Sequence, residues 1–277
     1  MPEGDTIFRA ARTLHRVFAG TIVTRFESVF PALNRVAEDS PIVGRTIESV
    51  TSRGKHLIVA LSGGLLLRTH MRMNGSWHVY PSGAPWRRPA RDMRVLLGTS
   101  DAVAVGFNVP VAEFVRTRDL GRHAVLKALG PDLLDPSFDR AEAKRRMRQR
   151  SRDAIGDVLL NQRVIAGIGN VFKAEVLFLA GVNPFAPVAA LTDASLDRVI
   201  DIAVEQLAAN VMTATQTLSR AVGRRTTRSL DPNEKLWVYG RGGRPCRRCG
   251  TPIASRAAGP EARLTYWCPR CQPDRRV

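Results

Sequence analysis

The sequence predicts an α+β protein of more than one domain, because three regions of the chain differ in pattern. Between residues 21 and 107, short β-branched runs separated by turns indicate antiparallel strands. From residue 141 to about residue 218, apolar residues recur at helical spacing. Beyond residue 223 the chain is rich in Arg, Gly and Pro and contains all four cysteines. We therefore expect a sheet region, a helical region and a small C-terminal element.

The first region is expected to begin with an amphipathic helix that leads into an antiparallel sandwich or barrel. Apolar residues repeat at helical spacing from Ile7 to Phe18, with Asp5 or Thr6 as the expected N-cap. The segment 80–89 contains three prolines and two adjacent arginines, so we expect an exposed loop there. Strands are expected at residues 21–26, 46–50, 56–61, 65–70 and 93–97, with hairpin connections at 62–64 and 98–101.

The helical region is expected to contain several helices rather than one. Its pattern is interrupted at residues 167–170 and near Pro184. A Gly-Pro-Asp sequence at residues 130–132 separates it from the strand region. The expected domains are residues 1–130, 131–225 and 236–274.

The charge of the chain restricts its partners. It contains 42 Lys and Arg against 25 Asp and Glu, a formal net charge of +17. Closely spaced phosphates match such a charge, so nucleic acid is favoured over a small acidic substrate. A membrane surface is disfavoured, because the sequence has neither a long apolar run nor a basic stretch with a broad apolar face. The first residues have no secretory pattern, so we expect the protein in the cytoplasm. With nucleic acid as its partner, we expect it at the nucleoid, and we expect a monomer.

The four cysteines form two closely spaced pairs. Cys246-x2-Cys249 and Cys268-x2-Cys271 have the spacing of a tetrahedral zinc site, and in a reducing compartment metal binding is favoured over disulfides. Residues 263–267 are expected to form the second strand of a hairpin between the pairs. A site closed by four thiolates has no open coordination position, so we expect one structural Zn²⁺ and a catalytic centre elsewhere.

The start of the chain offers a candidate nucleophile. Pro2 follows Met1, and a small second residue permits removal of the methionine, which exposes a secondary amine. An N-terminal amine has a reference pKa of about 7.7 to 8.0, so a useful fraction is unprotonated near neutral pH. It can attack C1′ of a sugar and form an iminium. Glu3 is a candidate acid and base beside it, although a carboxylate here is also explained by the helix dipole alone.

Four segments together resemble the formamidopyrimidine-DNA glycosylase and endonuclease VIII family. They read MPEGDT at residues 1–6, SRGKH at 52–56, GIGN at 167–170 and WCPRCQ at 267–272, in the family's order. The resemblance implies a helix-led antiparallel β-sandwich, a helix-two-turn-helix domain and a zinc finger. It also implies a bifunctional DNA glycosylase and apurinic/apyrimidinic lyase of base excision repair, which acts on damaged double-stranded DNA and cleaves the strand by β,δ-elimination.

The resemblance also assigns catalytic roles. Pro2 would be the Schiff-base nucleophile and Glu3 its acid and base partner. Lys55 would assist β-elimination and contact the lesion phosphate. Without the family motif, the simplest interpretation of Lys55 is an exposed, solvated lysine. Arg263 would bind phosphate and support δ-elimination, the alternative being an ordinary phosphate contact on a basic tail.

Further residues are implied to hold the DNA. Asn170, in a turn before a helix, would bind phosphate. Met73 would be the apolar wedge that fills the gap left by the everted nucleotide, unless this methionine is simply part of the core. His70 and Arg72 would contact nearby phosphate or the orphaned base. Glu175 matches an acidic position of the family with a supporting role.

Two departures from the family pattern bear on the substrate. Thr6 replaces a second acidic residue of many members, and the Asp-Pro-Arg-Arg-Phe-Gly-like strand is not evident, its nearest counterpart being residues 116–121. We therefore favour the endonuclease VIII branch and oxidised pyrimidines. The sequence His-Met-Arg-Met-Asn-Gly at 70–75 is more like the other branch, so an 8-oxoguanine or formamidopyrimidine glycosylase stays an alternative. A non-catalytic zinc-finger protein that binds damaged DNA is the alternative from another class.

Overall fold

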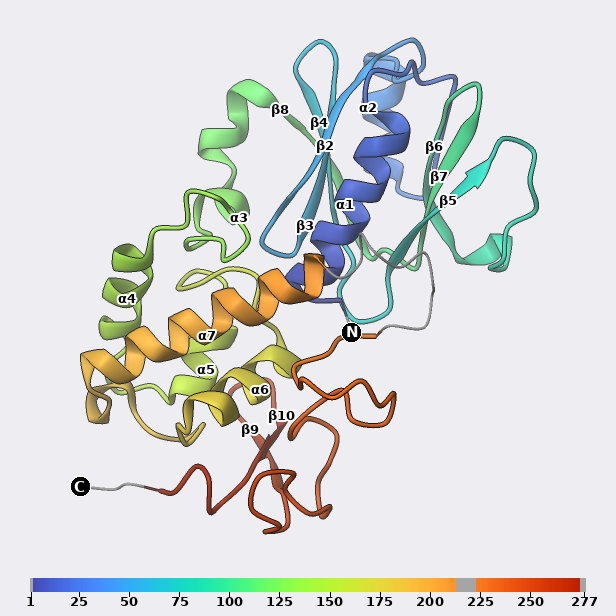
Figure 1. Ribbon diagram of the computed structural model, residues 1–277. Helices are drawn as coiled ribbons and strands as arrows, with labels where there is room; N and C mark the ends of the chain where they lie inside the picture. Colours follow the sequence, from blue (N-terminus) through green and yellow to red (C-terminus); the bar gives the residue numbers. More distant parts are fainter. Residues whose placement is uncertain (1, 213–222, 275–277) are drawn as a thin grey trace. The chain divides into compact units, whose positions relative to one another are not determined.

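A computed structural model describes residues 2–212 and 223–274 of the chain. It divides into two compact units, Met1–Ala128 and Leu129–Val277, called here the N-terminal and the C-terminal unit. Figure 1 shows the order of their elements along the chain. Among the described residues, no helix is both long and apolar enough to cross a membrane.

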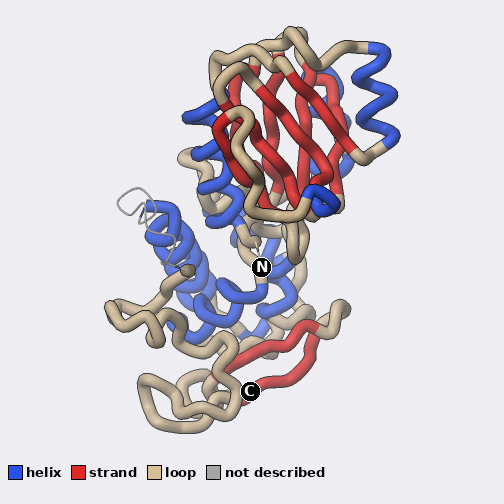
Figure 2. Tube along the Cα trace, turned by 90° about the vertical axis from the view of Figure 1, so that its right-hand side faces the viewer, coloured by secondary structure: helices blue, strands red, loops and turns tan. Residues whose placement is uncertain are grey.

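The N-terminal unit is a helix-led antiparallel β-sandwich, as the sequence predicts. Its two sheets have the strand orders β2-β3-β4-β8 and β1-β6-β7-β5, and Figure 2 shows the strands in red. Two α-helices precede the second strand, and a short helix ends the unit. The elements are α1 Gly4–Phe18, β1 Arg25–Ser28, α2 Pro31–Asp39, β2 Ile47–Arg53, β3 His56–Leu61, β4 Leu65–His70, β5 Ser76–Pro81, η1 Ala90–Asp92, β6 Met93–Gly98, β7 Ala102–Phe107, β8 Val111–Arg116, η2 Thr117–Arg122 and α3 Ala124–Lys127.

Alternation along the strands builds the core of this unit. Leu57, Val59, Leu65 and Leu67 point into one apolar cluster together with Phe18 of α1. Successive side chains of a strand face opposite sides of the sheet, so the residues between them lie on the other face. Burial of each such side chain contributes about 1.5 to 3 kcal/mol.

Three expectations for this unit were wrong in detail. α1 begins at Gly4 with Glu3 as its N-cap, because the Glu3 carbonyl already accepts the amides of Thr6 and Ile7. The strand expected at 21–26 is β1 at Arg25–Ser28, preceded only by an isolated bridge. Tyr80 and Pro81 belong to β5 rather than to a loop, and helix α2, with Pro31 in its first turn, was not expected.

The C-terminal unit begins with helices and ends with a hairpin. The helices are α4 Arg140–Arg148, α5 Ile155–Leu160, α6 Asn170–Ala180, η3 Val188–Ala190 and α7 Asp193–Met212. The expected interruptions at 167–170 and near Pro184 are confirmed, whereas the expected end of the pattern near 218 lies outside the described residues. The hairpin consists of β9 Ala254–Ala258 and β10 Arg263–Trp267, the second of which is the strand expected from the sequence.

Helices α6 and α7 pack against each other in the core of this unit. Phe172 and Leu177 of α6 lie in one apolar cluster with Leu196 and Ile200 of α7. Three ion pairs at successive turns connect α4 to α7: Arg140–Asp201, Lys144–Asp197 and Arg148–Asp193. The pairs are partly exposed, so the apolar contacts make the larger contribution to stability.

Candidate active site and DNA interface

Glu3 is fully buried at the head of α1. Its side chain is 0% exposed although it makes no capping hydrogen bond to the helix. Asp5, also buried, pairs with Arg9 at 3.4 Å. Burying a carboxylate costs free energy, and the positive end of the helix dipole offsets part of that cost. The structure therefore places a buried carboxylate directly after Pro2.

Lys55 lies at the tip of a tight hairpin. Arg53 of β2 pairs with His56 of β3, which leaves Gly54 and Lys55 as a two-residue turn. Gly54 has φ 58°, a left-handed conformation that glycine adopts without strain. His56, the next residue, is paired with His70 of β4. Burial lowers the pKa of His70, and the charges of Arg72 and Lys55 lower it further. The structure thus brings Lys55 and His70 together.

The turn after β4 displays one methionine and buries another. Met71 is 2% exposed, whereas Met73 is 56% exposed. The close approach of Gly75 to this turn requires glycine, because a Cβ there would lie 2.5 Å from the Met71 carbonyl oxygen. A hollow of about 450 Å³ opens beside the turn; it is lined by Met71, Arg72, Met73, Asn74, Arg94, Asn108 and Pro110. Met73 is therefore accessible in this turn, and Met71 belongs to the apolar core.

Asn170 and Arg263 lie together in the C-terminal unit. The Asn170 amide nitrogen donates to the carbonyl oxygen of Leu264 at 3.0 Å, which joins the start of α6 to β10 beside Arg263. Asn170 Oδ1 is buried without a hydrogen-bond partner among the described residues. Arg263 forms an ion pair with Glu261, and its side chain is 33% exposed. The Asn170 side chain therefore also holds the hairpin in place, which its sequence motif does not indicate.

Glu175 connects helix α6 to the segment that enters the zinc finger. Its carboxylate accepts the backbone amides of Trp237, Val238 and Tyr239 at 2.7 to 2.9 Å, and it also accepts the Thr226 hydroxyl. Burial raises the pKa of this carboxyl, while these four hydrogen bonds act in the opposite direction. The contacts account for an acidic residue at this position without any role in chemistry.

The four cysteines form a site for one structural Zn²⁺. Their sulfur atoms all lie within 4.8 Å of one another. The Cys249–Cys268 and Cys246–Cys271 sulfur distances are 3.5 and 4.0 Å. Tetrahedral zinc with Zn–S bonds of about 2.3 Å requires sulfurs about 3.8 Å apart, so the donor set fits the metal. Hydrogen bonds from Thr251 lower the pKa of Cys249 to about 6, whereas burial raises the pKa of Cys268 and of Cys271, so binding of the metal must supply the free energy that deprotonates those two thiols.

Gln272 fastens the metal-binding element to the helices. Its side chain is 0% exposed, accepts the amide of Cys268 at 3.0 Å and donates to the Val182 carbonyl at 2.8 Å. Asn183 donates to the Gln272 carbonyl at 3.0 Å. The end of helix α6 and the second cysteine pair are thereby joined.

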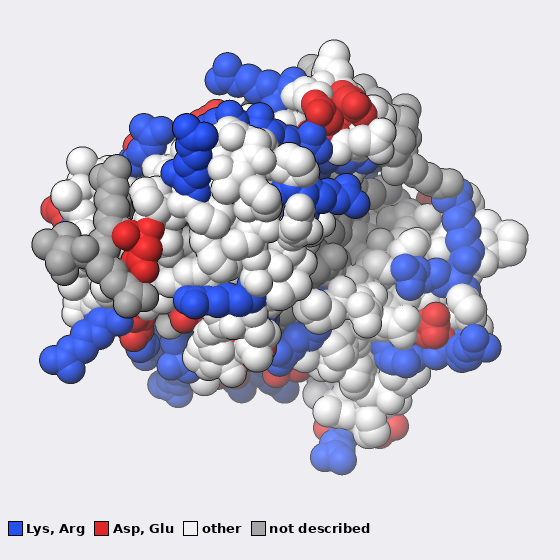
Figure 3. Space-filling view, turned by 90° about the horizontal axis from the view of Figure 1, so that it is seen from below, with Lys and Arg blue, Asp and Glu red and all other residues white. Residues whose placement is uncertain are grey.

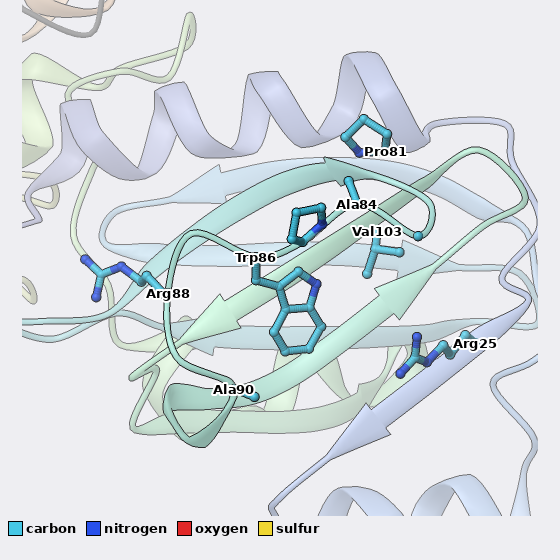
Figure 4. A pocket seen from close by; sticks show the side chains of 9 residues that line it. Arg25, Pro81, Ala84, Trp86, Arg88, Ala90 and Val103 are labelled. Atoms are coloured by element: carbon cyan, nitrogen blue, oxygen red, sulfur yellow. The ribbon is translucent and has the colours of Figure 1, made fainter.

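A second hollow lies in the N-terminal unit. It has a volume of about 450 Å³ and lies where segment 81–90 passes over strand β7, with Trp86 in its middle (Figure 4). Arg25 and Arg88 also line it. None of the residues predicted to act on DNA lines this hollow, so it is not the candidate active site.

Comparison with known proteins identifies the family of the chain. Three family models match it: the formamidopyrimidine-DNA glycosylase N-terminal domain at residues 1–122, the H2TH domain of the same glycosylase at 129–222, and a zinc finger found in FPG and IleRS at 243–273. The chain is 42% identical to "Probable endonuclease 8 2" of Streptomyces coelicolor, covering 98% of this chain and 94% of that protein.

Two further matches extend over the whole chain. "DNA-(apurinic or apyrimidinic site) lyase Nei2" of Mycolicibacterium smegmatis is 37% identical, with 98% of this chain and 99% of that protein covered. Lactococcus lactis Fpg, solved in complex with DNA that contains an abasic site, superposes with a TM-score of 0.82 at 25% identity, covering 99% of this chain and 100% of that one. The chain belongs to the formamidopyrimidine-DNA glycosylase and endonuclease 8 family.

The surface suits a family of DNA-repair glycosylases. On the face drawn in Figure 3, Lys and Arg side chains are more widespread than acidic ones, in keeping with the net charge of +17. Such a surface attracts the phosphates of DNA and releases their counterions on binding.

Sequence reasoning missed two residues that support the family's functional elements. Lys173 is 1% exposed and donates to the Thr265 hydroxyl at 2.7 Å, beneath the hairpin that carries Arg263. Arg68 is 5% exposed and pairs with Glu113 across the sheet. A charged residue directly after three consecutive leucines in a strand is the signal that marks Arg68.

Proposed function

We propose that the protein is a bifunctional DNA glycosylase and apurinic/apyrimidinic lyase that removes oxidised bases in base excision repair. The observation that carries the proposal is the buried Glu3 carboxylate, which directly follows Pro2 at the head of α1. A buried carboxylate beside an amine of near-neutral pKa is the pairing that covalent catalysis at a sugar carbon requires.

The proposed chemistry starts with the Pro2 amine. Its lone pair attacks C1′ of the damaged nucleotide, and the bond from C1′ to the base breaks. The base leaves with the bonding electrons and takes up a proton, while the new C1′–nitrogen centre loses one. Glu3 protonates the ring oxygen as the C1′–O4′ bond opens to the iminium. Loss of a C2′ proton then expels the 3′ phosphate, a step that Lys55 assists through the lesion phosphate. A second elimination, supported by Arg263, expels the 5′ phosphate, and hydrolysis of the iminium frees Pro2.

The proposed partner is damaged double-stranded DNA, bound by a monomer at the nucleoid in the cytoplasm. Asn170 and Arg263 would hold phosphates, and His70 and Arg72 would contact the strand near the lesion. Met73, at 56% exposure, would enter the stack as the wedge. We assign these roles to proposed domains at residues 1–130, 131–225 and 236–274.

The proposed substrates are oxidised pyrimidines, because the curated relatives with whole-length matches include proteins named endonuclease 8. A second candidate is an 8-oxoguanine or formamidopyrimidine glycosylase, since similar structures include MutM bound to DNA that contains carbocyclic 8-oxo-G. Duplexes with thymine glycol, 5-hydroxyuracil or 8-oxoguanine opposite cytosine separate the two. Preferential release of 8-oxoguanine, with little release of the pyrimidines, would favour the second candidate.

Borohydride trapping tests the central claim. Reduction of the iminium should give a stable protein–DNA adduct, visible as a slow band on a denaturing gel and mapped to the N-terminal peptide. Lys55→Ala should keep part of the base release but lose strand cleavage. A protein whose N-terminus is blocked by an uncleaved tag should bind DNA but neither trap nor cut it. Equally efficient cross-linking by the blocked protein would show that Pro2 is not the nucleophile. A protein that only binds damaged DNA would give no adduct with either the free or the blocked N-terminus.

A further inference from the structure

The outer face of the sheet β2-β3-β4-β8 carries a buried polar network. Its centre is Arg68 on β4, which is 5% exposed and lies directly opposite Glu113 of β8. The Arg68 guanidinium pairs with the Glu113 carboxylate and donates to Nδ1 of His56 at 2.8 Å. The same carboxylate oxygen lies 2.8 Å from Nε2 of His123. A buried guanidinium with partners on both sides is strongly constrained in position.

The hydrogen bonds define one tautomer for three imidazoles. Arginine can only donate, so Nδ1 of His56 accepts. Nδ1 of His70 accepts the Arg72 amide at 3.0 Å, and Nδ1 of His123 accepts the Leu126 amide at 3.2 Å. Each ring, when neutral, therefore carries its proton on Nε2. His123 can then donate that proton to Glu113.

The network lies between the two functional turns of this unit. His56 follows Lys55 directly, and it pairs with His70, with ring centroids 4.8 Å apart. Nδ1 of His70 in turn accepts a hydrogen bond from the backbone amide of Arg72. Arg72 has a left-handed backbone conformation, with φ 48°, and precedes Met73 in the turn. The left-handed conformation costs free energy for a residue other than glycine, and the hydrogen bond from the Arg72 amide to the His70 ring helps to stabilise it.

We infer that Arg68 is a positioning residue: through His56 and Glu113 it holds the Lys55 turn (Gly54 and Lys55) and the Met73 turn (residues 71–75) in a fixed relation, and its donation to Nδ1 fixes His56 in the Nε2–H form. The inference rests on the proposed function for its link to catalysis, but the protonation states belong to the free protein. His70 would then contact DNA as a neutral hydrogen-bond donor rather than as a cation.

Electrostatics agree with this role. Burial lowers the pKa of His56 to about 3, with further lowering by His70 and Arg68 of β4, by His123 after η2 and by Arg72. Burial likewise lowers the pKa of His70 to about 4, with further lowering by Arg72, Lys55 and Arg68. The Glu113 carboxylate is the acidic group that balances Arg68. Neither imidazole is therefore charged near neutral pH.

Nuclear magnetic resonance of the full chain labelled with ¹⁵N at its five histidines tests the inference without DNA. The wild type should show neutral Nε2–H rings for His56 and His70 from pH 5.5 to 7.5. In Arg68→Met, Nδ1 of His56 loses its donor, so the ring nitrogen shifts should report a mixture of the two neutral tautomers, and loss of the Arg68 charge should raise the pKa of His56. Arg116→Met, which removes an exposed charge from the same sheet, should match the wild type. A charged or Nδ1–H ring at His56 in the wild type, or an unchanged Arg68→Met spectrum, would overturn the inference.

Cleavage of duplexes with a preformed abasic site supplies the second readout. Arg68→Met should slow strand cleavage about tenfold or more, because small displacements of catalytic groups are costly. Arg68→Lys should restore most of the rate, and Arg116→Met should stay within about twofold of the wild type. An equal loss of strand-cleavage rate in Arg68→Lys and Arg68→Met would contradict a positioning role. If Arg68→Met does not fold, Glu113→Gln serves instead: it removes the carboxylate that fixes Arg68, so the His56 nitrogen shifts should change, and unchanged shifts would overturn the inference. Failure of wild-type trapping would refute the proposed function and leave the spectroscopic result intact.

Discussion

At the scale of single residues, the site is made of side chains whose roles depend on what holds them. Met71 and Met73 are two positions apart, yet one is 2% exposed and the other 56%. Alternation in sequence does not say which of two methionines faces solvent in a turn. The family resemblance predicts Met73 as the wedge, and the structure shows that Met73 is the accessible methionine of the pair.

Asn170 and Arg263 should affect DNA binding in different ways. Arg263→Ala removes a positive charge, so the slope of log K against log salt should fall by about 1. Asn170→Ala should weaken binding to damaged and undamaged duplexes alike, with the slope unchanged, because a neutral amide releases no counterion. Titrations at several salt concentrations measure both slopes.

Arg263→Lys is the matched control, since it keeps the charge while changing the shape of the side chain. It should keep the wild-type slope. An Arg263→Ala slope equal to that of the wild type would rule out a phosphate contact at this position.

At the scale of elements, the hairpin β3–β4 places two imidazoles side by side in a buried environment. Both have a lower pKa in the folded protein, about 3 for His56 and about 4 for His70, against 6.5 for an unperturbed histidine. The unfolded chain therefore binds these protons at higher pH than the folded chain does. Their contribution to stability is complete above pH 6.5 and is lost as the pH falls toward the folded values.

The free energy of unfolding should accordingly fall between pH 7.5 and pH 5.0. His56 alone should account for about 2 kcal/mol of that loss. Urea titrations at the two pH values measure it, and His56→Gln should reduce the difference by the same amount. An identical difference in the variant and the wild type would show that His56 is not held neutral.

The sequence predicts secondary structure correctly where the residues of a single strand or helix show its periodicity or composition without help from distant parts of the chain. β3, β4 and β10 have the residues expected from the sequence, because each is an unbroken run of strand-forming residues bounded by turns. The sequence predicts a loop where β5 ends, since Pro81 is typical of a turn. It predicts the start of α1 two or three residues too late, because Asp5 and Thr6 are good N-caps by composition while the backbone of Glu3 accepts the capping bonds.

At the scale of the whole molecule, the metal supports the element that carries Arg263. The residues around the four cysteines are too few to build a core of their own, so zinc must supply much of their folding free energy. Chelation, or Cys249→Ser, should abolish tight DNA binding and release the finger. Fluorescence should respond, because Trp237 and Trp267 belong to this part of the chain.

The helices of the C-terminal unit have their own apolar cluster, so their circular dichroism should persist after zinc removal. Restoring zinc should restore DNA binding. A metal-free protein that binds and cleaves DNA like the wild type would contradict a structural role for the metal.

By itself the sequence determined the fold class, the family and the donor set for zinc, since these depend on local periodicity, motif order and spacing. Only the tertiary structure decided how distant side chains are paired: Arg68 with Glu113, Glu175 with the amides of residues 237–239, and Asn170 with Leu264. The physical reason is that such pairs form between segments far apart in the chain. Which of them meet depends on strand register and on the packing of helix against hairpin, and neither of these leaves a repeating pattern along the sequence.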